Sequence, residues 1–101
     1  MIPSDFQFRI YGWMVSKYRL RGNDLIVFAY LHYHTVCMVE HGCVQSRKEI
    51  AAHLGISVNT VHKVMESLYL NGLAEKCRMF VRGNMVTVYR TTVEEKGYEK
   101  A

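Results

Sequence analysis

The sequence predicts a mainly α-helical domain that ends in a small β-hairpin. Apolar residues recur at helical spacing through most of residues 10–71. Two strand-like runs, rich in Val, Phe, Tyr and Thr, follow at 73–81 and 85–92. The chain has 101 residues, half of them hydrophobic, which is enough to bury one core without disulfides. We therefore treat residues 1–101 as a single domain.

Residues 10–42 are expected to form two N-terminal helices separated by a break. The first is predicted from Ile10 to Tyr18, where large apolar side chains gather. Arg21-Gly22-Asn23 interrupts the pattern, and Asn23 is a good N-cap because its side chain accepts hydrogen bonds from helix-start amides. A helix from Asp24 to about Glu40 follows, with Gly42 as its stop.

The helix predicted at 24–40 is apolar almost all round, which is typical of a helix buried on more than one side. Two interpretations follow from this pattern. Either the N-terminal arm at 6–10, which alternates apolar and polar residues as an extended segment does, packs over the helix, or a second copy of the protein does. The second interpretation makes the chain a homodimer through helix 24–40.

Residues 46–71 carry the most informative pattern, two short helices joined by a tight turn. Ser46 and Glu49 form a capping box for the first helix. Gly55 is expected to end that helix, and Ser57 to cap the second. Apolar residues at helical spacing give each helix a core side: Ile50, Ala51 and Leu54 in the first, and Val58, Val61, Val64, Met65 and Leu68 in the second. This is a helix-turn-helix, whose second helix commonly lies in the major groove of DNA.

Residues 73–92 are predicted to form a hairpin after the stop signal Asn71-Gly72. Gly83-Asn84 is the expected tight turn between its strands. A hairpin directly after a helix-turn-helix makes the predicted fold a winged helix-turn-helix. Before the motif, residues 43–45 have room only for a short strand. The tail at 93–101 is polar and expected to be frayed.

Charge and composition narrow the class of function. Residues 43–92 hold seven Lys and Arg against three Glu, so the net charge of +4 sits with the helix-turn-helix and hairpin, as phosphate binding favours. No apolar run approaches the roughly 20 residues of a membrane span, and the N-terminus does not resemble a secretion signal. Three cysteines, an odd number, fit a reducing, cytoplasmic location. No phosphate loop, nucleophile elbow or paired carboxylates are present, so we expect no enzymatic activity.

Histidines and cysteines gather in one stretch, which raises the question of a metal site. The residues are His32, His34, Cys37, His41 and Cys43. Their spacing does not match a zinc finger, since there is no Cys-x-x-Cys and Cys77 stands far away. Packing of semi-polar side chains against the core is the favoured interpretation. We expect neither a metal nor any other cofactor.

The helix-turn-helix resembles that of the winged helix-turn-helix superfamily of bacterial regulators, with the MarR- and GntR-like groups nearest in style. The resemblance is carried by the run Ile50-Ala51-Ala52-His53-Leu54-Gly55-Ile56-Ser57-Val58-Asn59-Thr60-Val61, by Leu68 and by Asn71-Gly72-Leu73. The upstream run is similar to small helix-turn-helix proteins of phages and mobile elements, and to N-terminal domains of plasmid-type replication initiators. It comprises Trp13-Met14-Val15, Leu20, Gly22-Asn23, Leu25-Ile26 and Ala29-Tyr30. Together these segments span roughly residues 10–92.

The resemblance implies roles for individual positions. Ser57 would cap the recognition helix and can touch a phosphate, and the side chains expected to face DNA are Asn59, Thr60, His62 and Lys63. Val58 and His62 stand where these regulators often have arginine. Helical spacing gives the same face independently, because Asn59 and Lys63 fall opposite the apolar side.

Other candidate contacts come from the first motif helix and the hairpin. Ser46, Arg47 and Lys48 stand at a helix start, where phosphates also meet backbone amides. Arg82 and Asn84 are the candidate anchors in the hairpin, while Arg78 and Arg90 could equally protect strand edges. For the second motif helix the alternative is an ordinary solvated face, and Glu66 on that face argues for it.

The function predicted from these residues is sequence-specific binding of double-stranded DNA by a transcriptional regulator of a phage or mobile element. The chain leaves no room for an effector domain, so no small-molecule effector is expected, and no membrane association either. Two alternatives remain. One is a replication-initiation module that binds an origin, and the other is a protein-interaction winged helix that binds no DNA.

Overall fold

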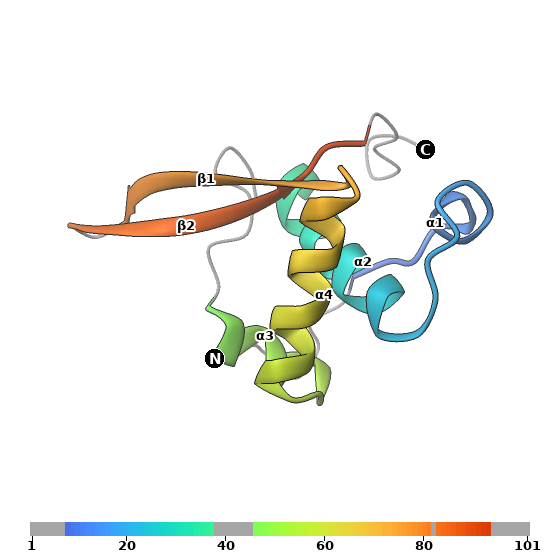
Figure 1. Cartoon of the computed structure of the whole chain (residues 1–101), viewed down its shortest axis with the longest axis horizontal. Helices are drawn as coiled ribbons and strands as arrows, with labels where there is room; N and C mark the ends of the chain where they lie inside the picture. Colours follow the sequence, from blue (N-terminus) through green and yellow to red (C-terminus); the bar gives the residue numbers. More distant parts are fainter. Residues whose placement is uncertain (1–7, 38–45, 82, 94–101) are drawn as a thin grey trace.

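The computed structural model describes residues 8–37, 46–81 and 83–93, and Figure 1 shows their arrangement. These ranges form four helices and a two-stranded antiparallel hairpin: α1 Gly12–Ser16, α2 Gly22–Cys37, α3 Arg47–Leu54, α4 Val58–Leu70, β1 Ala74–Val81 and β2 Asn84–Thr91. The prediction of a mainly helical chain with a small hairpin is confirmed. None of the described helices is long and apolar enough to cross a membrane.

Helix α2 lies at the centre and is enclosed by the rest of the chain. Five consecutive residues, Val27 to Leu31, have no exposed surface, which covers every direction around a helix. α2 contacts α4, β2 and α1. The N-terminal segment completes the cover, because Phe8 packs edge-on against Tyr30, and Trp13 against Phe28 and His32. Of the two interpretations of this apolar helix, its described part fits the one in which its own chain covers it.

The N-terminal helices differ from the prediction at their ends. α1 is shorter than the predicted 10–18, and α2 begins at Gly22 rather than Asp24. Leu25 N donates to Arg21 O at 3.3 Å, which closes the first turn of α2 two residues early. Asn23 is therefore inside the helix instead of capping it. The predicted helix end near Glu40 and Gly42, the short strand at 43–45 and most of the tail lie outside the described residues.

The turn between α3 and α4 follows the predicted capping signals. Ser46 Oγ accepts from Glu49 N at 3.1 Å while Glu49 Oε1 accepts from Ser46 N at 2.9 Å, so the capping box is confirmed. Gly55 ends α3 with a φ of 72°, a left-handed conformation that side chains with a Cβ rarely adopt. Ser57 Oγ caps α4 by accepting from Thr60 N at 3.0 Å. Both ends of the turn are thus fixed by local hydrogen bonds.

The hairpin has a register one residue away from the predicted turn. Val81 pairs with Asn84, so Asn84 belongs to the second strand and the turn is not Gly83-Asn84. Gly83 has a φ of 83°, which suits a tight turn. The register keeps Tyr89 and Thr91 on one face of β2 and Val88 on the other, and all three are buried. A slip of one residue would turn all three to the wrong face.

Polar contacts join the hairpin to α2 at a fixed place. His32 Nδ1 lies 3.0 Å from Thr91 Oγ1, and Thr91 N donates to Thr35 Oγ1 at 3.1 Å. The residue after β2 is held as well, because Thr92 Oγ1 donates to Gly72 O at 2.6 Å. Since His32 and Thr91 are buried, these bonds satisfy groups that would otherwise be costly to bury. They set the direction in which the hairpin leaves the core.

Burial of His34 makes the stability of the fold sensitive to acid. Its ring lies 4.7 Å from that of Tyr30, and burial, followed by the proximity of His53, lowers its pKa to about 4. The unfolded chain, with an ordinary histidine pKa of about 6.5, then binds more protons than the folded chain between pH 4 and 6.5. We expect the free energy of unfolding to fall by about 2 kcal/mol as the pH is lowered through that window. Urea denaturation at a series of pH values measures this fall.

The matched variant is His34→Phe, which keeps a ring of similar size and has no proton to gain. Acidic side chains titrate in the same window in both proteins, so the difference between the two pH profiles isolates His34. The variant should show a clearly shallower loss of stability between pH 6.5 and 4. Identical slopes in the two proteins would contradict the assignment.

Candidate nucleic-acid interface

Helix α4 presents a polar face to solvent, opposite the core. Val61, Val64, Met65 and Leu68 are buried, and this apolar side fixes the rotation of the helix. Asn59, His62 and Lys63 are exposed. The prediction that Asn59 and Lys63 lie opposite the apolar side therefore agrees with their positions.

Ser57 and Thr60, also predicted as DNA contacts, form the N-terminal cap of α4. Ser57 Oγ accepts from Thr60 N, and the two hydroxyl oxygens lie 2.8 Å apart. Thr60 is half-buried, while Ser57 is exposed. A phosphate approaching the start of α4 would meet an exposed hydroxyl that is already oriented by its capping bonds.

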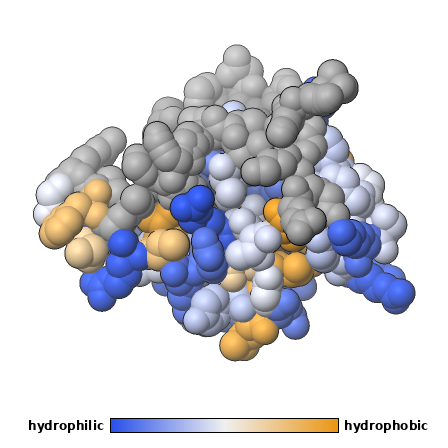
Figure 2. All heavy atoms as spheres, turned by 90° about the horizontal axis from the view of Figure 1, so that it is seen from above, coloured by the Kyte–Doolittle hydropathy of each residue, from blue (hydrophilic) through white to orange (hydrophobic). Residues whose placement is uncertain are grey.

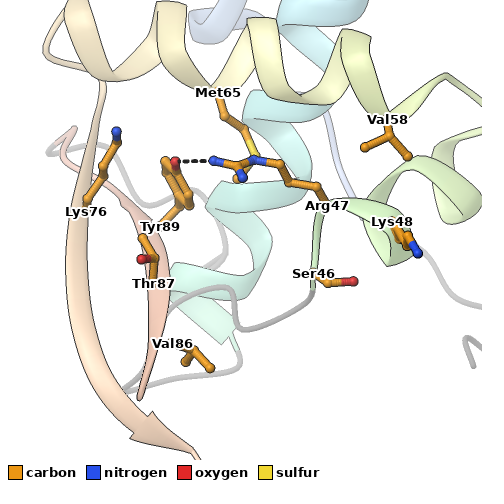
Figure 3. Close-up of a pocket in the computed structure, with 9 residues that line it drawn as sticks. All are labelled: Ser46, Arg47, Lys48, Val58, Met65, Lys76, Val86, Thr87 and Tyr89. Atoms are coloured by element: carbon orange, nitrogen blue, oxygen red, sulfur yellow. Dashed lines mark hydrogen bonds between the residues drawn. The ribbon is translucent and has the colours of Figure 1, made fainter. Parts of the chain in front are cut away.

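A hollow of about 570 Å³ opens between the start of α3, helix α4 and the hairpin (Figure 3). It brings together three of the predicted site residues and several that sequence reasoning did not place there. The lining residues are Ser46, Arg47, Lys48, Val58, Met65, Lys76, Val86, Thr87 and Tyr89. On α4 the hollow is lined by Val58 and Met65, which lie at least about 100° around the helix from Asn59 and Lys63.

Arg47 reaches across the hollow and is fixed there. Its Nη2 donates to Tyr89 Oη at 3.0 Å, and its guanidinium carbon lies 5.9 Å from the centre of that ring (Figure 3). Its Nε is buried and has no hydrogen-bond partner among the described residues. Lys48, by contrast, is exposed and points away from Tyr89. The two neighbouring cations, predicted as equivalent anchors, thus differ: Arg47 is bound to Tyr89, whereas Lys48 is exposed to solvent.

The negative charge of Glu66 is offset by neighbours on the hairpin. Lys76 Nζ lies 3.1 Å from Glu66 Oε2, and Tyr89 Oη donates to the same oxygen at 3.4 Å. The hydrogen bond from Lys76 is the main cause that lowers the pKa of Glu66, and the same bond raises the pKa of Lys76. Lys76 also lies 4.4 Å from the centre of the Tyr69 ring. The carboxylate that argued against nucleic-acid binding in the sequence is therefore compensated.

The hairpin residues divide between two faces. Lys76 and Arg78 pair with Tyr89 and Thr87, so these four share the face that bounds the hollow. Asn84 alternates to the other face and does not join the hollow, and Arg82 lies outside the described residues. Arg90, also on the other face, has its Nε 4.0 Å from Glu75 Oε2. The geometry thus distinguishes Arg78, on the face that bounds the hollow, from Arg90, which lies beside Glu75 on the other face. The sequence alone offers no reason to treat the two differently.

Sequence reasoning did not identify Tyr89 and Lys76 as parts of this site. The available signal was the alternation of Thr87, Tyr89 and Thr91 along one strand face, which becomes informative once the register is known. Of the residues considered as metal ligands, His32 and His34 pack among aromatic rings of the core, while His41 and Cys43 lie outside the described residues. No group of three metal-ligating side chains occurs in the described ranges.

The hydroxyl of Tyr89 joins α3, α4 and β2, so its removal should loosen this side of the molecule. Tyr89→Phe deletes the bonds to Arg47 and Glu66 but keeps the ring, which is almost wholly buried. We expect the free energy of unfolding to drop by about 1–2 kcal/mol, measured by urea denaturation.

Tyr69→Phe is the control, because Tyr69 is 43% exposed and its hydroxyl has no hydrogen bond within the described chain. Its stability should stay within about 0.5 kcal/mol of the parent. Equal losses in the two variants would show that the Tyr89 hydroxyl does not hold the three elements together.

Comparison with known proteins gives no family assignment. No protein-family model matches the chain, and no curated protein matches it either.

Proposed function

We propose that this domain is a winged helix-turn-helix that binds double-stranded DNA, with α4 as the recognition helix. The observation that carries the proposal is the outward projection of Asn59 and Lys63 from a helix whose other side is locked into the core. Rigid presentation matters because base contacts need donors and acceptors at defined positions. The caps at Ser46, Gly55 and Ser57 supply that rigidity at the motif turn.

The dimensions and chemistry of α4 suit the major groove. An α-helix with side chains is about 10–12 Å across, and the groove is about 12 Å wide. Asn59 can pair with an adenine edge through two hydrogen bonds, and Lys63 can donate to guanine or to phosphate. His62, one residue before Lys63 and also exposed, adds a donor or acceptor.

Phosphate contacts would flank the helix on both sides of the hollow. At the start of α3, Lys48 stands beside backbone amides whose helix dipole favours anions. On the hairpin, Arg78 lies on the face that bounds the hollow. Within the described ranges, neither Lys48, Lys63 nor Arg78 forms an ion pair, so their charges are available to DNA. Arg47 contributes charge from a fixed position, since it is held by Tyr89.

The resemblance drawn from the sequence extends this proposal to transcriptional regulation, with replication initiation as the other role that DNA binding would serve. Footprinting on a neighbouring promoter and on an origin separates the two. Homodimerisation belongs to the same proposal, but the enclosure of α2 over residues 27–31 leaves that stretch without surface for a second copy. A dimer would therefore use surfaces other than this stretch.

The first test is a titration of labelled random-sequence duplex, followed by fluorescence anisotropy at about 50 mM and about 200 mM salt. The parent should bind, and more weakly at the higher salt. Lys63→Gln should weaken binding and, where the lysine meets a phosphate, lower the salt slope of the logarithm of affinity by about 0.9. Lys63→Glu should weaken binding more strongly, because it places a negative charge against the polyanion.

Arg21→Gln is the matched control, since it removes one charge from an exposed residue elsewhere. The start of α2 lies against the far end of α4, where Asp24 lines a second hollow with Ser67 and Asn71. Its affinity should stay within about twofold of the parent, because a charge beyond a Debye length of about 10 Å is largely screened. Absence of binding by the parent at low salt, with Lys63→Glu silent, would instead support a protein-interaction domain.

A further inference from the structure

The outer half of the hairpin extends away from the helices, as Figure 1 shows. Val88 and Tyr89 are the outermost buried residues of β2. Beyond them, four cross-strand pairs remain, from Arg78 with Thr87 to Val81 with Asn84. At about 3.4 Å per residue this outer part is about 10 Å long.

An apolar pair stands near the end of this extension. Phe80 and Met85 lie directly opposite each other in the register, and their exposed fractions are 70% and 46%. Neither belongs to the hydrophobic core or to the residues packed against it. Figure 2 shows hydrophobic atoms at this hairpin end of the molecule, on the left. The two side chains thus form a small apolar surface that the fold itself does not use.

The position of the pair relates it to the proposed DNA interface. Phe80 shares a strand face with Lys76 and Arg78, and Met85 with Thr87 and Tyr89, so the pair lies on the face that bounds the hollow. Arg78 and Thr87 form a cross-strand pair nearer the helices than Phe80 and Met85, and Thr87 lines the hollow. No Asp or Glu occurs anywhere in residues 78–87. Going outward along this face, the cation Arg78 therefore comes first and the apolar pair of Phe80 and Met85 follows. No acidic residue of this segment offsets the positive charge.

We propose that Phe80 and Met85 form a wedge that enters the minor groove beside the segment bound by α4 and unstacks a base step there. This rests on the proposed function and deepens it, because it names a bent duplex as the bound form. DNA offers phosphates outside and apolar base faces inside, which matches Arg78 followed by Phe80. Proteins that insert Phe or Met between base steps kink the duplex by about 20–90°. The flexible thioether of Met85 can adapt to the opened step.

The alternative occupant of this apolar pair is a second copy of the chain, joined through the hairpin ends. Such an arrangement would bring two basic outer hairpins together, with Arg78 of each copy near the other and no carboxylate in residues 78–87 to offset them. Charge complementarity therefore favours the polyanion over a second copy. The two differ in an observable way, because a wedge changes the DNA and a dimer contact changes the mass of the protein.

The experiment uses the whole chain and a random-sequence duplex of about 30 base pairs with a donor dye at one end and an acceptor at the other. Saturating wild-type protein should raise the energy transfer, since a bend brings the ends closer. Phe80→Ala should lose at least half of that rise and bind about tenfold more weakly, while its salt slope stays unchanged because no phosphate contact is lost. Phe80→Leu should keep the bend, since it preserves an apolar wedge.

Two further variants serve as controls. Val15→Ala shortens an apolar side chain that is 45% exposed on α1, at the opposite end of the molecule in Figure 1, and should alter neither affinity nor bend. Arg78→Gln should lower the salt slope by about 0.9 and leave the bend in place. Circular dichroism of each variant checks that the hairpin is still formed.

The outcomes separate the wedge from DNA binding itself. Wild-type binding without any change in energy transfer, or a Phe80→Ala protein that bends DNA like wild type, overturns the wedge and leaves the proposed function standing. Absence of duplex binding by the wild-type protein overturns both. Sedimentation that shows a dimer turned into a monomer by Phe80→Ala, with DNA bending intact, assigns the pair to a second copy and also overturns the wedge.

Discussion

The enclosure of α2 is the constraint on which the rest of the structure depends. A helix with five successive buried residues needs partners on all sides, and this small chain supplies them from α1, α4, β2 and the segment around Phe8. Each partner is thereby oriented by the side chain that it must cover. The rotation of α4, and with it the direction of Asn59 and Lys63, follows from its burial of Val61, Val64 and Leu68 in the shared core. The polar face is what remains after that burial is satisfied.

The hairpin is positioned by a different kind of interaction, a few buried polar contacts. His32 and Thr35 on α2 meet Thr91 on β2, where the hairpin leaves the core. Buried hydrogen bonds are directional, so they fix an angle that apolar packing alone would leave loose. On the other side, Tyr89 accepts from Arg47 and donates to Glu66, which ties the hairpin to α3 and α4. The hairpin is therefore held at its base by two sets of contacts, and its outer half extends away from the helices (Figure 1).

The parts of this fold that the sequence predicts are the ones set by local chemistry. The capping box at Ser46, the left-handed Gly55 and the cap at Ser57 each depend on residues within one turn, and all three are observed. The start of α2 and the hairpin turn were predicted wrongly, for different reasons. The local bond from Leu25 N to Arg21 O closes the first turn of α2 before Asp24, whereas at the hairpin the burial of Tyr89 and Thr91 outweighs the local turn signal. Asn23 is a good cap, yet the helix already begins at Gly22, and Gly83-Asn84 is a good turn, yet Tyr89 and Thr91 must face the core. For the candidate site, the helical face was predictable from spacing, whereas the Arg47–Tyr89–Glu66–Lys76 cluster was not, because it joins residues up to 42 positions apart.

That cluster also explains how an acidic residue can stand beside a surface proposed to bind DNA. Glu66 holds Lys76 by an ion pair and Tyr89 by a hydrogen bond, and Tyr89 in turn holds Arg47. Deleting the carboxylate would raise the net charge by one but would also release the hairpin side chains that it orients. The gain would be a diffuse charge, screened within about 10 Å at ordinary salt, and the loss would be a defined geometry. A surface that must place donors against particular atoms depends more on geometry than on total charge. Its cations therefore fall into two groups. Arg47 and Lys76 are held by their partners, whereas Lys48, Lys63 and Arg78 are exposed without an ion pair in the described part of the chain.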